Sequence, residues 1–347
     1  MSNQISSSVL SWYDANAREL PWRVGPAARA SGAQADAYRV WLSEIMLQQT
    51  TVQTVRPRYS RFLERWPTVM DLAHAEQDDV LAEWAGLGYY ARARNLHKCA
   101  RVVAKEYGGV FPDTEEELLK LPGVGAYTSA AIAAIAFNRR AVVVDGNIER
   151  VASRLFAIET PLKQAKGEIK AAMNEVWPAD RSGDFAQALM DLGAGICTPR
   201  SPTCLLCPIK QKCRAVKTDN PARFPIKAPK AEKPQRQGIA YALWNAKGDI
   251  LFEKRPEKGL LGGMLGLPGT EWTASKVSPK PPADADWQSA GKVRHTFTHF
   301  HLDLEVMVGN APKGWRSGDG QSWGAPSEVS LPTVMRKAVA AALSKLN

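Results

Sequence analysis

The sequence predicts a protein of two domains, a mainly α-helical N-terminal domain followed by a smaller α+β domain. The length of 347 residues exceeds the ~250–300 residues at which a single hydrophobic core usually stops growing. Helix-spaced apolar residues dominate residues 1–216, whereas strand-like alternation dominates residues 236–347. Residues 217–235 between them are rich in Pro and Lys, which is typical of an extended, semi-rigid linker.

The composition excludes several classes of protein. A hydrophobic content of 45% with 11 Trp and 9 Phe excludes an intrinsically disordered chain. No run of about 18 apolar residues is present, so we expect neither a membrane-spanning helix nor a membrane partner. The N-terminus lacks a basic segment followed by an apolar one, so we expect no signal peptide and a cytoplasmic location. The net charge of +10 favours a polyanionic partner, although a solubilising charge is the alternative.

The predicted elements follow from apolar spacing and from the positions of Gly and Pro. In the first domain, helices are predicted at 38–55, 78–86, 90–107, 115–120, 126–137 and 147–158. In the second domain, two strands are joined by a turn at Asn245–Asp249, and a final helix is predicted at 332–345. Another strand of that domain places four apolar residues on one face: Leu302, Leu304, Val306 and Val308.

Four of the five cysteines lie close together in the sequence, with the spacing C-x6-C-x2-C-x5-C. They are Cys197, Cys204, Cys207 and Cys213. Four thiols at this density in a reducing compartment indicate a metal site rather than disulfides. Zinc usually takes paired CxxC or CxxC/His motifs, and only one CxxC is present here without a nearby His. An iron–sulfur cluster therefore fits the spacing better, with zinc as the alternative.

The segment Leu121–Gly125, LPGVG, predicts a tight turn between two helices. Gly123 and Gly125 allow the backbone to turn sharply and to approach a ligand closely. The helix that follows presents free N–H groups at its N-terminus, which suit a phosphate without reading sequence. An ordinary helical hairpin is the alternative interpretation.

Two acidic residues stand out as candidates for catalysis. Glu44 interrupts a helix face that is otherwise apolar, with Val40, Trp41 and Leu47 as neighbours. Desolvation there raises a carboxyl pKa and keeps the group protonated near neutral pH, as a general acid requires. A surface Glu is the alternative. Asp145 ends an apolar stretch directly before a helix, and by itself this position predicts only a helix cap.

These motifs appear in the same order in a known family. The cysteine spacing, the LPGVG hairpin, VDGN around Asp145 and SEIMLQQT around Glu44 resemble the MutY-type adenine DNA glycosylases of the endonuclease III superfamily. The resemblance extends from about Val9 to about Leu343. It implies a helix-hairpin-helix glycosylase domain, a 4Fe–4S cluster held by the four cysteines, and a Nudix-like C-terminal domain that recognises 8-oxoguanine.

The resemblance assigns catalytic roles to four residues. Glu44 would protonate N7 of adenine and then activate water. Asp145 would stabilise the oxocarbenium-like sugar or attack it covalently, and Asn147 would orient that centre. Tyr127 would support the catalytic carboxylate. It stands where bifunctional members carry the lysine that forms a Schiff base, so a monofunctional enzyme is implied.

The resemblance also assigns residues that contact the base and the DNA. The adenine pocket would be lined by Trp22, Arg23, Leu47 and Gln187, of which only Arg23 and Gln187 could read polar edges. Contacts to the opened duplex would come from Gln49, Thr50, Leu87, Tyr89, Gly123 and Gly125. The 8-oxoguanine loop would contain Phe297, Thr298 and His299. Thr298 replaces the Ser of many members and retains its hydroxyl.

Three further features bear on the family pattern. By spacing alone, His295, His299 and His301 are candidate metal ligands, but no acidic or Cys partner completes such a site. The segment that follows GLLGGMLGLPG lacks the carboxylates that a Nudix hydrolase needs for Mg²⁺, so this domain is expected to recognise rather than hydrolyse. An insertion of small residues near 25–36 separates the Pro-Trp-Arg motif from the catalytic helix.

The function implied is that of an adenine DNA glycosylase of base excision repair. It would act as a monomer on duplex DNA, hydrolysing the N-glycosidic bond of adenine paired with 8-oxoguanine or guanine, with no protein partner identified. One alternative is an endonuclease III-type glycosylase/lyase acting on oxidised pyrimidines, which Tyr127 and the second domain disfavour. The other is a non-catalytic iron–sulfur DNA-binding module, which the presence of Glu44 and Asp145 disfavours.

Overall fold

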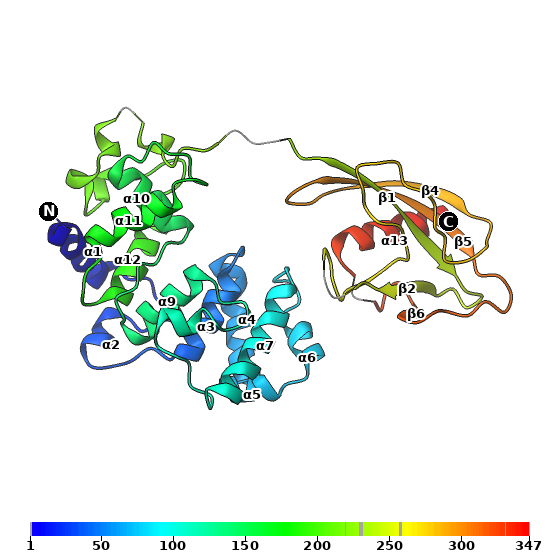
Figure 1. The fold of residues 1–347 in the computed structure, drawn as a ribbon, viewed down its shortest axis with the longest axis horizontal. Helices are drawn as coiled ribbons and strands as arrows, with labels where there is room; N and C mark the ends of the chain where they lie inside the picture. The colour runs from blue at the N-terminus through cyan, green and yellow to red at the C-terminus, as the bar shows by residue number, and fades with distance from the viewer. Residues whose placement is uncertain (1, 219, 229–231, 257–258, 330, 347) are drawn as a thin grey trace. The chain divides into compact units, whose positions relative to one another are not determined.

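A computed structural model describes residues 2–218, 220–228, 232–256, 259–329 and 331–346. The chain divides into two compact units, Met1–Pro229 and Lys230–Asn347 (Figure 1). The expected linker at 217–235 is therefore wrong in extent. Phe224 is 1% exposed, and its carbonyl accepts a hydrogen bond from Arg154 Nε at 3.1 Å. Burial of this aromatic ring holds part of the Pro-rich segment against the first unit.

The first unit is built from helices that surround a continuous apolar core. Its helices are α1 (Ser2–Asn16), α2 (Pro26–Ala30), α3 (Ala37–Leu47), α4 (Val52–Arg65), α5 (Val69–His74), α6 (Gln77–Glu83), α7 (Ala91–Glu106), α8 (Glu115–Leu118), α9 (Ala126–Phe137), α10 (Gly146–Phe156), α11 (Lys166–Val176) and α12 (Ser182–Gly195). Ala-rich α9 is buried through most of its length and packs against α3 and α12. A Cβ on Gly183 would lie 2.4 Å from the Ala134 carbonyl oxygen, so glycine permits the close approach of α12 to α9.

The helix predicted at 38–55 is two helices, α3 and α4, separated by a turn. Gln49 in this turn has a φ of 58°, in the left-handed region. Thr51 caps α4, because its side chain accepts a hydrogen bond from the Thr54 N–H at 3.3 Å. Thr favours this capping role over a helix interior, so a local preference breaks the long apolar pattern.

The predicted hairpin joins α8 to α9, but its two glycines have different roles. Gly123 has a φ of 76°, and a Cβ on it would lie 2.8 Å from Asn95 Cβ. Gly125, in contrast, adopts a conformation that does not depend on glycine. Its φ of −101° is open to any residue, and a Cβ there would contact nothing within 4 Å. Gly125 begins α9 without a side-chain cap.

The second unit is a mixed sheet with one long helix on a face. Its elements are β1 (Gln235–Trp244), β2 (Ile250–Lys254), β3 (Leu265–Gly266), β4 (Gln288–Thr296), β5 (His301–Asn310), β6 (Gln321–Gly324) and α13 (Thr333–Leu346). The sheet order is β3-β2-β1-β5-β4, and β6 pairs with β2. β1 and β5 are parallel, and the other pairs are antiparallel.

The sequence pattern of the second unit is confirmed in its main elements. The turn at Asn245–Asp249 joins β1 to β2, and α13 matches the final predicted helix. The four apolar residues of β5 are buried in one core with α13. Residues 267–287 contain no helix, so no helix follows the loop where a Nudix hydrolase would place its metal-binding carboxylates. None of the described helices is long and apolar enough to cross a membrane.

Candidate active site

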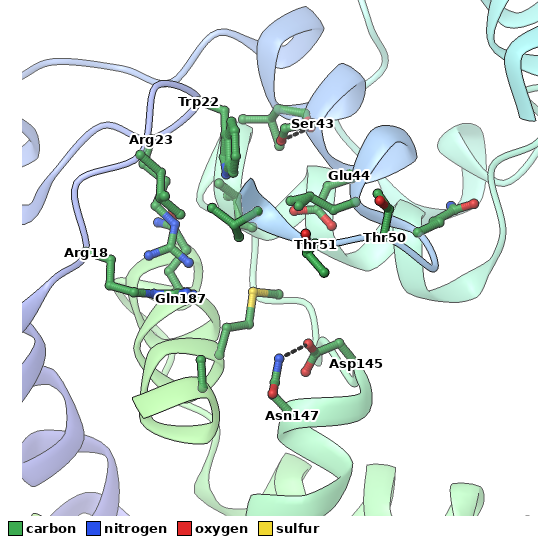
Figure 2. A pocket seen from close by; sticks show the side chains of 18 of the residues that line it. Arg18, Trp22, Arg23, Ser43, Glu44, Thr50, Thr51, Asp145, Asn147 and Gln187 are labelled. Atoms are coloured by element: carbon green, nitrogen blue, oxygen red, sulfur yellow. Dashed lines mark hydrogen bonds between the residues drawn. The ribbon is translucent and has the colours of Figure 1, made fainter. Parts of the chain in front are cut away.

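A cavity of about 710 Å³ opens in the first unit, a size typical of small-molecule sites (Figure 2). Its walls come from the loop after α1, from α3 and the turn that follows it, and from α9, α10 and α12. The residues predicted for catalysis and for the adenine pocket all line it, together with Thr50: Trp22, Arg23, Glu44, Leu47, Tyr127, Asp145, Asn147 and Gln187. The fold thus brings together residues from five separate parts of the sequence.

Glu44 is buried, with 6% of its surface exposed, so the alternative of a surface Glu is wrong. The Tyr127 hydroxyl donates a hydrogen bond to Glu44 Oε2 at 2.5 Å. Burial raises the pKa of Glu44 to about 7, against the opposing effect of the Tyr127 hydrogen bond. The negative charge of Asp145 raises this pKa further, and Arg23 lowers it. A carboxyl group with such a pKa exists in both protonation states at neutral pH.

Asp145 caps α10 and also faces the cavity, so the two interpretations of this residue are compatible. Its Oδ1 accepts from the Ile148 N–H at 2.7 Å, and its Oδ2 accepts from Asn147 Nδ2 at 2.9 Å. Burial raises the pKa of Asp145, while these donors act in the opposite direction. Figure 2 shows Glu44 and Asp145 on opposite sides of the cavity.

Arg23 lines the cavity, but its guanidinium is already engaged. Its Nη1 lies 2.8 Å from both carboxylate oxygens of Asp191, whose side chain is 1% exposed. Arg18 Nε donates to the same carboxylate at 2.6 Å. Sequence reasoning missed Arg18 and Asp191. The available signal was that Asp191 lies four residues after Gln187, on the same face of α12.

Gln187 is buried, and its Nε2 has no hydrogen-bond partner among the residues that the structure describes. Leaving a buried amide unpaired costs free energy, so a polar atom of a ligand in the cavity would be stabilised there. Of the two predicted readers of the base edge, Gln187 therefore has the free donor.

Arg150 connects the cavity to the cysteine loop, and sequence reasoning missed it as well. Its Nη2 donates to Asn147 Oδ1 at 2.8 Å and to the Gly193 carbonyl at 2.7 Å. Its Nε donates to the Cys197 carbonyl at 2.7 Å. The Arg150 guanidinium therefore fixes the position of the Asn147 amide, which bonds Asp145, with respect to Cys197.

The four clustered cysteines are free thiols, and each is partly buried. Burial raises the pKa of Cys207 to about 11, and the charges of Cys197, Cys213 and Cys204 raise it further, so the four thiols share one neighbourhood. Arg154 Nη1 lies 3.3 Å from Cys197 Sγ. Within the described ranges, no group of three or more His, Cys, Asp or Glu is placed to hold a metal ion. Four partly buried thiols on one loop have the donor chemistry of a thiolate-ligated cluster, but the described residues do not place three of them in the geometry of a metal site.

The predicted DNA-contact residues of the first unit lie in three loops, and Thr50 is the one of them that lines the cavity. Gln49 and Tyr89 are exposed, and both have left-handed backbones, with φ values of 58° and 49°. Leu87, in contrast, is 4% exposed and belongs to the core. Non-glycine residues with a left-handed backbone, such as Gln49 and Tyr89, are uncommon and often mark functional sites.

In the second unit, Phe297–Phe300 form the tight turn between β4 and β5, closed by Phe297 N–H donating to the Phe300 carbonyl at 2.9 Å. Thr298 and His299 are exposed at its tip. The Phe297 ring stacks on Phe300 with centroids 4.8 Å apart and lies beside Trp272. In the ranges described, the three histidines form no metal group, so the alternative of a histidine metal site gains no support.

Comparison with known proteins agrees with this geometry. Residues 42–179 match the family model of the HhH-GPD superfamily base excision DNA repair proteins, and residues 239–341 match the NUDIX domain. The structure of a thermostable thymine-DNA glycosylase matches with a TM-score of 0.55 and 30% identity, over 62% of this chain and 96% of that one.

Two curated relatives extend the match beyond single domains. The adenine DNA glycosylase of Homo sapiens is 35% identical over 86% of this chain, which spans 65% of that protein's length. The adenine DNA glycosylase of Buchnera aphidicola subsp. Acyrthosiphon pisum is 38% identical, over 96% of this chain and 95% of that protein. Because this identity covers nearly the full length of both chains, the protein belongs to the family of adenine DNA glycosylases.

Proposed function

We propose that the protein hydrolyses the N-glycosidic bond of adenine paired with 8-oxoguanine or guanine in duplex DNA and leaves an abasic site. The observation that carries this proposal is one cavity in which two carboxyl groups, Glu44 and Asp145, have different environments. Pairs of carboxyl groups with different environments divide into an acid and an anion in glycoside hydrolysis.

Glu44 acts as the general acid. In its protonated form it donates a proton to N7 of adenine, which makes the base a better leaving group. The resulting carboxylate accepts the Tyr127 hydrogen bond and then removes a proton from the attacking water. Gln187 supplies its unpaired amide N–H to a polar edge of the base, while Trp22 and Leu47 pack against it.

Asp145 acts as the anion. As the bond to the base breaks, positive charge develops on the sugar, and the carboxylate stabilises that charge or forms a covalent bond with the sugar carbon. Asn147 and the Ile148 N–H hold the carboxylate in place. No lysine is among the described residues that line the cavity, and the Tyr127 phenol cannot form a Schiff base, so the chemistry stops at the abasic site.

The DNA is held by features of both units. The N–H groups at the start of α9 suit a phosphate, because Gly125 provides no side-chain cap. Gln49, Thr50 and Tyr89 support the opened duplex, whereas the buried Leu87 packs beneath the loop of Tyr89 without contacting DNA. The exposed hydroxyl of Thr298, with His299 and the Phe297 ring, recognises 8-oxoguanine.

We propose that Cys197, Cys204, Cys207 and Cys213 hold a 4Fe–4S cluster. When bound, such a cluster supplies an electron-transfer centre and iron–thiolate bonds that cross-link the loop. Glycosidic hydrolysis needs no electron, so the ligands serve stability and the position of the loop. Arg154 contributes its guanidinium charge beside Cys197 Sγ.

Single-turnover cleavage of four duplexes tests the function. They carry A opposite 8-oxoguanine, A opposite G, A opposite T, and thymine glycol opposite A, each assayed with and without alkali. We expect strand cleavage at mispaired adenine only after alkali, fastest opposite 8-oxoguanine. Alkali-independent cleavage at thymine glycol, with adenine untouched, would establish the lyase alternative instead.

The pH dependence of the excision rate should report the protonation of Glu44. Because the protonated form is active, the single-turnover rate is expected to hold below about pH 7 and to fall above it. In Tyr127→Phe, loss of the hydrogen bond that lowers the Glu44 pKa should move this alkaline limb to higher pH. Tyr107→Phe, whose hydroxyl bonds Glu117 outside the cavity, is the control. An alkaline limb that stays in place or moves down in Tyr127→Phe would contradict this assignment.

Asp145→Asn should separate capping from catalysis. Asn caps helices about as well as Asp, so the melting temperature should stay close to that of the wild type. The excision rate should fall by roughly 10²–10³-fold because the anion is lost. Asp36→Asn, which alters the cap of α3 outside the cavity, should keep full activity. Excision by Asp145→Asn at the wild-type rate would reduce Asp145 to a helix cap.

The iron and sulfide content of the purified protein tests the proposed cluster. Purified protein should contain iron and acid-labile sulfide in equal amounts, and Cys204→Ser should lose both and melt at a lower temperature. Cys99→Ala is the control, because Cys99 is buried in the helical core away from the loop. Full iron content in Cys204→Ser would refute its assignment as a ligand.

A further inference from the structure

Two loops carry the exposed left-handed residues, and one side chain, Arg92 at the start of α7, contacts the end of the helix before the first loop and the backbone of the second loop. The loops are the turn at 48–51, which contains Gln49, and the loop at 87–90, which contains Tyr89. The guanidinium of Arg92 donates to backbone carbonyls on both sides. The loops are far apart in sequence, so this contact is a tertiary one.

On the α3 side, Arg92 Nη1 donates to the carbonyls of Ile45 at 2.9 Å and Met46 at 3.2 Å. Both carbonyls lie in the last turn of α3, where helix carbonyls lack an intrahelical partner. A cation is also favoured at this end by the helix dipole. Arg92 therefore fixes the end of the helix from which the turn at 48–51 departs.

On the other side, Arg92 Nη2 donates to the carbonyls of Leu87 at 3.0 Å and Gly88 at 3.3 Å. The Gly88 carbonyl also accepts from Trp84 Nε1 at 3.0 Å. The guanidinium carbon lies 5.3 Å from the Trp84 ring centroid and 5.6 Å from that of Tyr89, within the range of cation–π contact. The Arg92 guanidinium therefore contacts the Tyr89 ring as well as the backbone before it.

The backbone conformations explain why such a contact is needed. A non-glycine residue with positive φ is strained and persists only where its surroundings fix it. Gln49 and Tyr89 are both exposed, so contacts of their own side chains with the core do not fix them. Hydrogen bonds from Arg92 to the end of α3, one turn before Gln49, and to the carbonyl directly before Tyr89 fix the backbone instead.

We propose that Arg92 is a positioning residue that holds the two loops at a fixed separation, so that Gln49 and Tyr89 enter the opened duplex as one unit. This inference rests on the proposed function, because it assumes that the loops contact DNA. Only a planar guanidinium can donate to both pairs of carbonyls at once. A lysine has a single ammonium group and would satisfy one side at a time.

The test compares Arg92→Gln and Arg92→Lys with Arg101→Gln, an exposed residue of the same helix without a hydrogen bond among those described. One readout is the fluorescence rise of 2-aminopurine placed at the target position opposite 8-oxoguanine, which reports unstacking. The other is the single-turnover excision rate of adenine, measured across pH. Melting temperature and affinity for fully paired DNA are measured alongside.

For Arg92→Gln we expect most of the fluorescence rise to be lost and the excision rate to fall roughly tenfold or more, because unstacking is impaired. Affinity for fully paired DNA should stay within about twofold, as for Arg101→Gln. The midpoint of the alkaline limb should not move, because Glu44 keeps its environment. Arg92→Lys should lie between Arg92→Gln and the wild type.

Three results would overturn the inference: a wild-type fluorescence rise in Arg92→Gln, a rate loss with a shifted alkaline limb, or an equal loss in Arg101→Gln. If Arg92→Gln does not fold, Arg92→Lys decides by the same readouts, since it keeps the charge. Failure of the proposed function is distinct. There the wild type excises no adenine, while the fluorescence comparison still reports whether Arg92 affects unstacking.

Discussion

The burial of the Glu44 carboxyl group is the constraint on which the active site depends. A pKa raised from 4.5 to about 7 corresponds to about 3 kcal/mol of free energy against ionisation. The fold provides this environment by placing Glu44 in the interior of α3, against the Ala-rich α9. The single hydrogen bond from Tyr127 leaves the group close to its titration point at neutral pH, where an acid works best.

The other charges of the cavity are arranged so that they do not cancel this effect. Two arginines line the site, and both are paired with Asp191, so the lowering of the Glu44 pKa by Arg23 is a smaller effect than burial. Asp145 obtains its donors from its own helix, through the Ile148 N–H and Asn147. Each carboxyl group therefore has its own set of hydrogen-bond donors, so the two acidic groups of one cavity lie in different environments.

The sequence predicted these features to different degrees, for physical reasons. Glu44 was detectable because a charged residue interrupts a periodic apolar face, a signal that spans only one helix. Asp145 was assigned through family resemblance, because its local pattern is that of a cap. Asp191 has only a weak sequence signal, its position one turn after Gln187, since its partner Arg23 lies 168 residues away and only the tertiary fold joins them. The break between α3 and α4 was missed because a local capping preference of Thr51 outweighs periodicity.

A chain of hydrogen bonds connects the cysteine loop to the active-site cavity. Arg150 bonds the Cys197 carbonyl, the Gly193 carbonyl and Asn147 Oδ1, and Asn147 in turn bonds Asp145. Gly193 permits this arrangement, because a Cβ there would lie 2.6 Å from Asn147 Cβ. A displacement of the loop backbone would therefore move the guanidinium and, through two hydrogen bonds, the Asp145 carboxylate. Whatever orders the cysteine loop therefore also orders the Asp145 carboxylate.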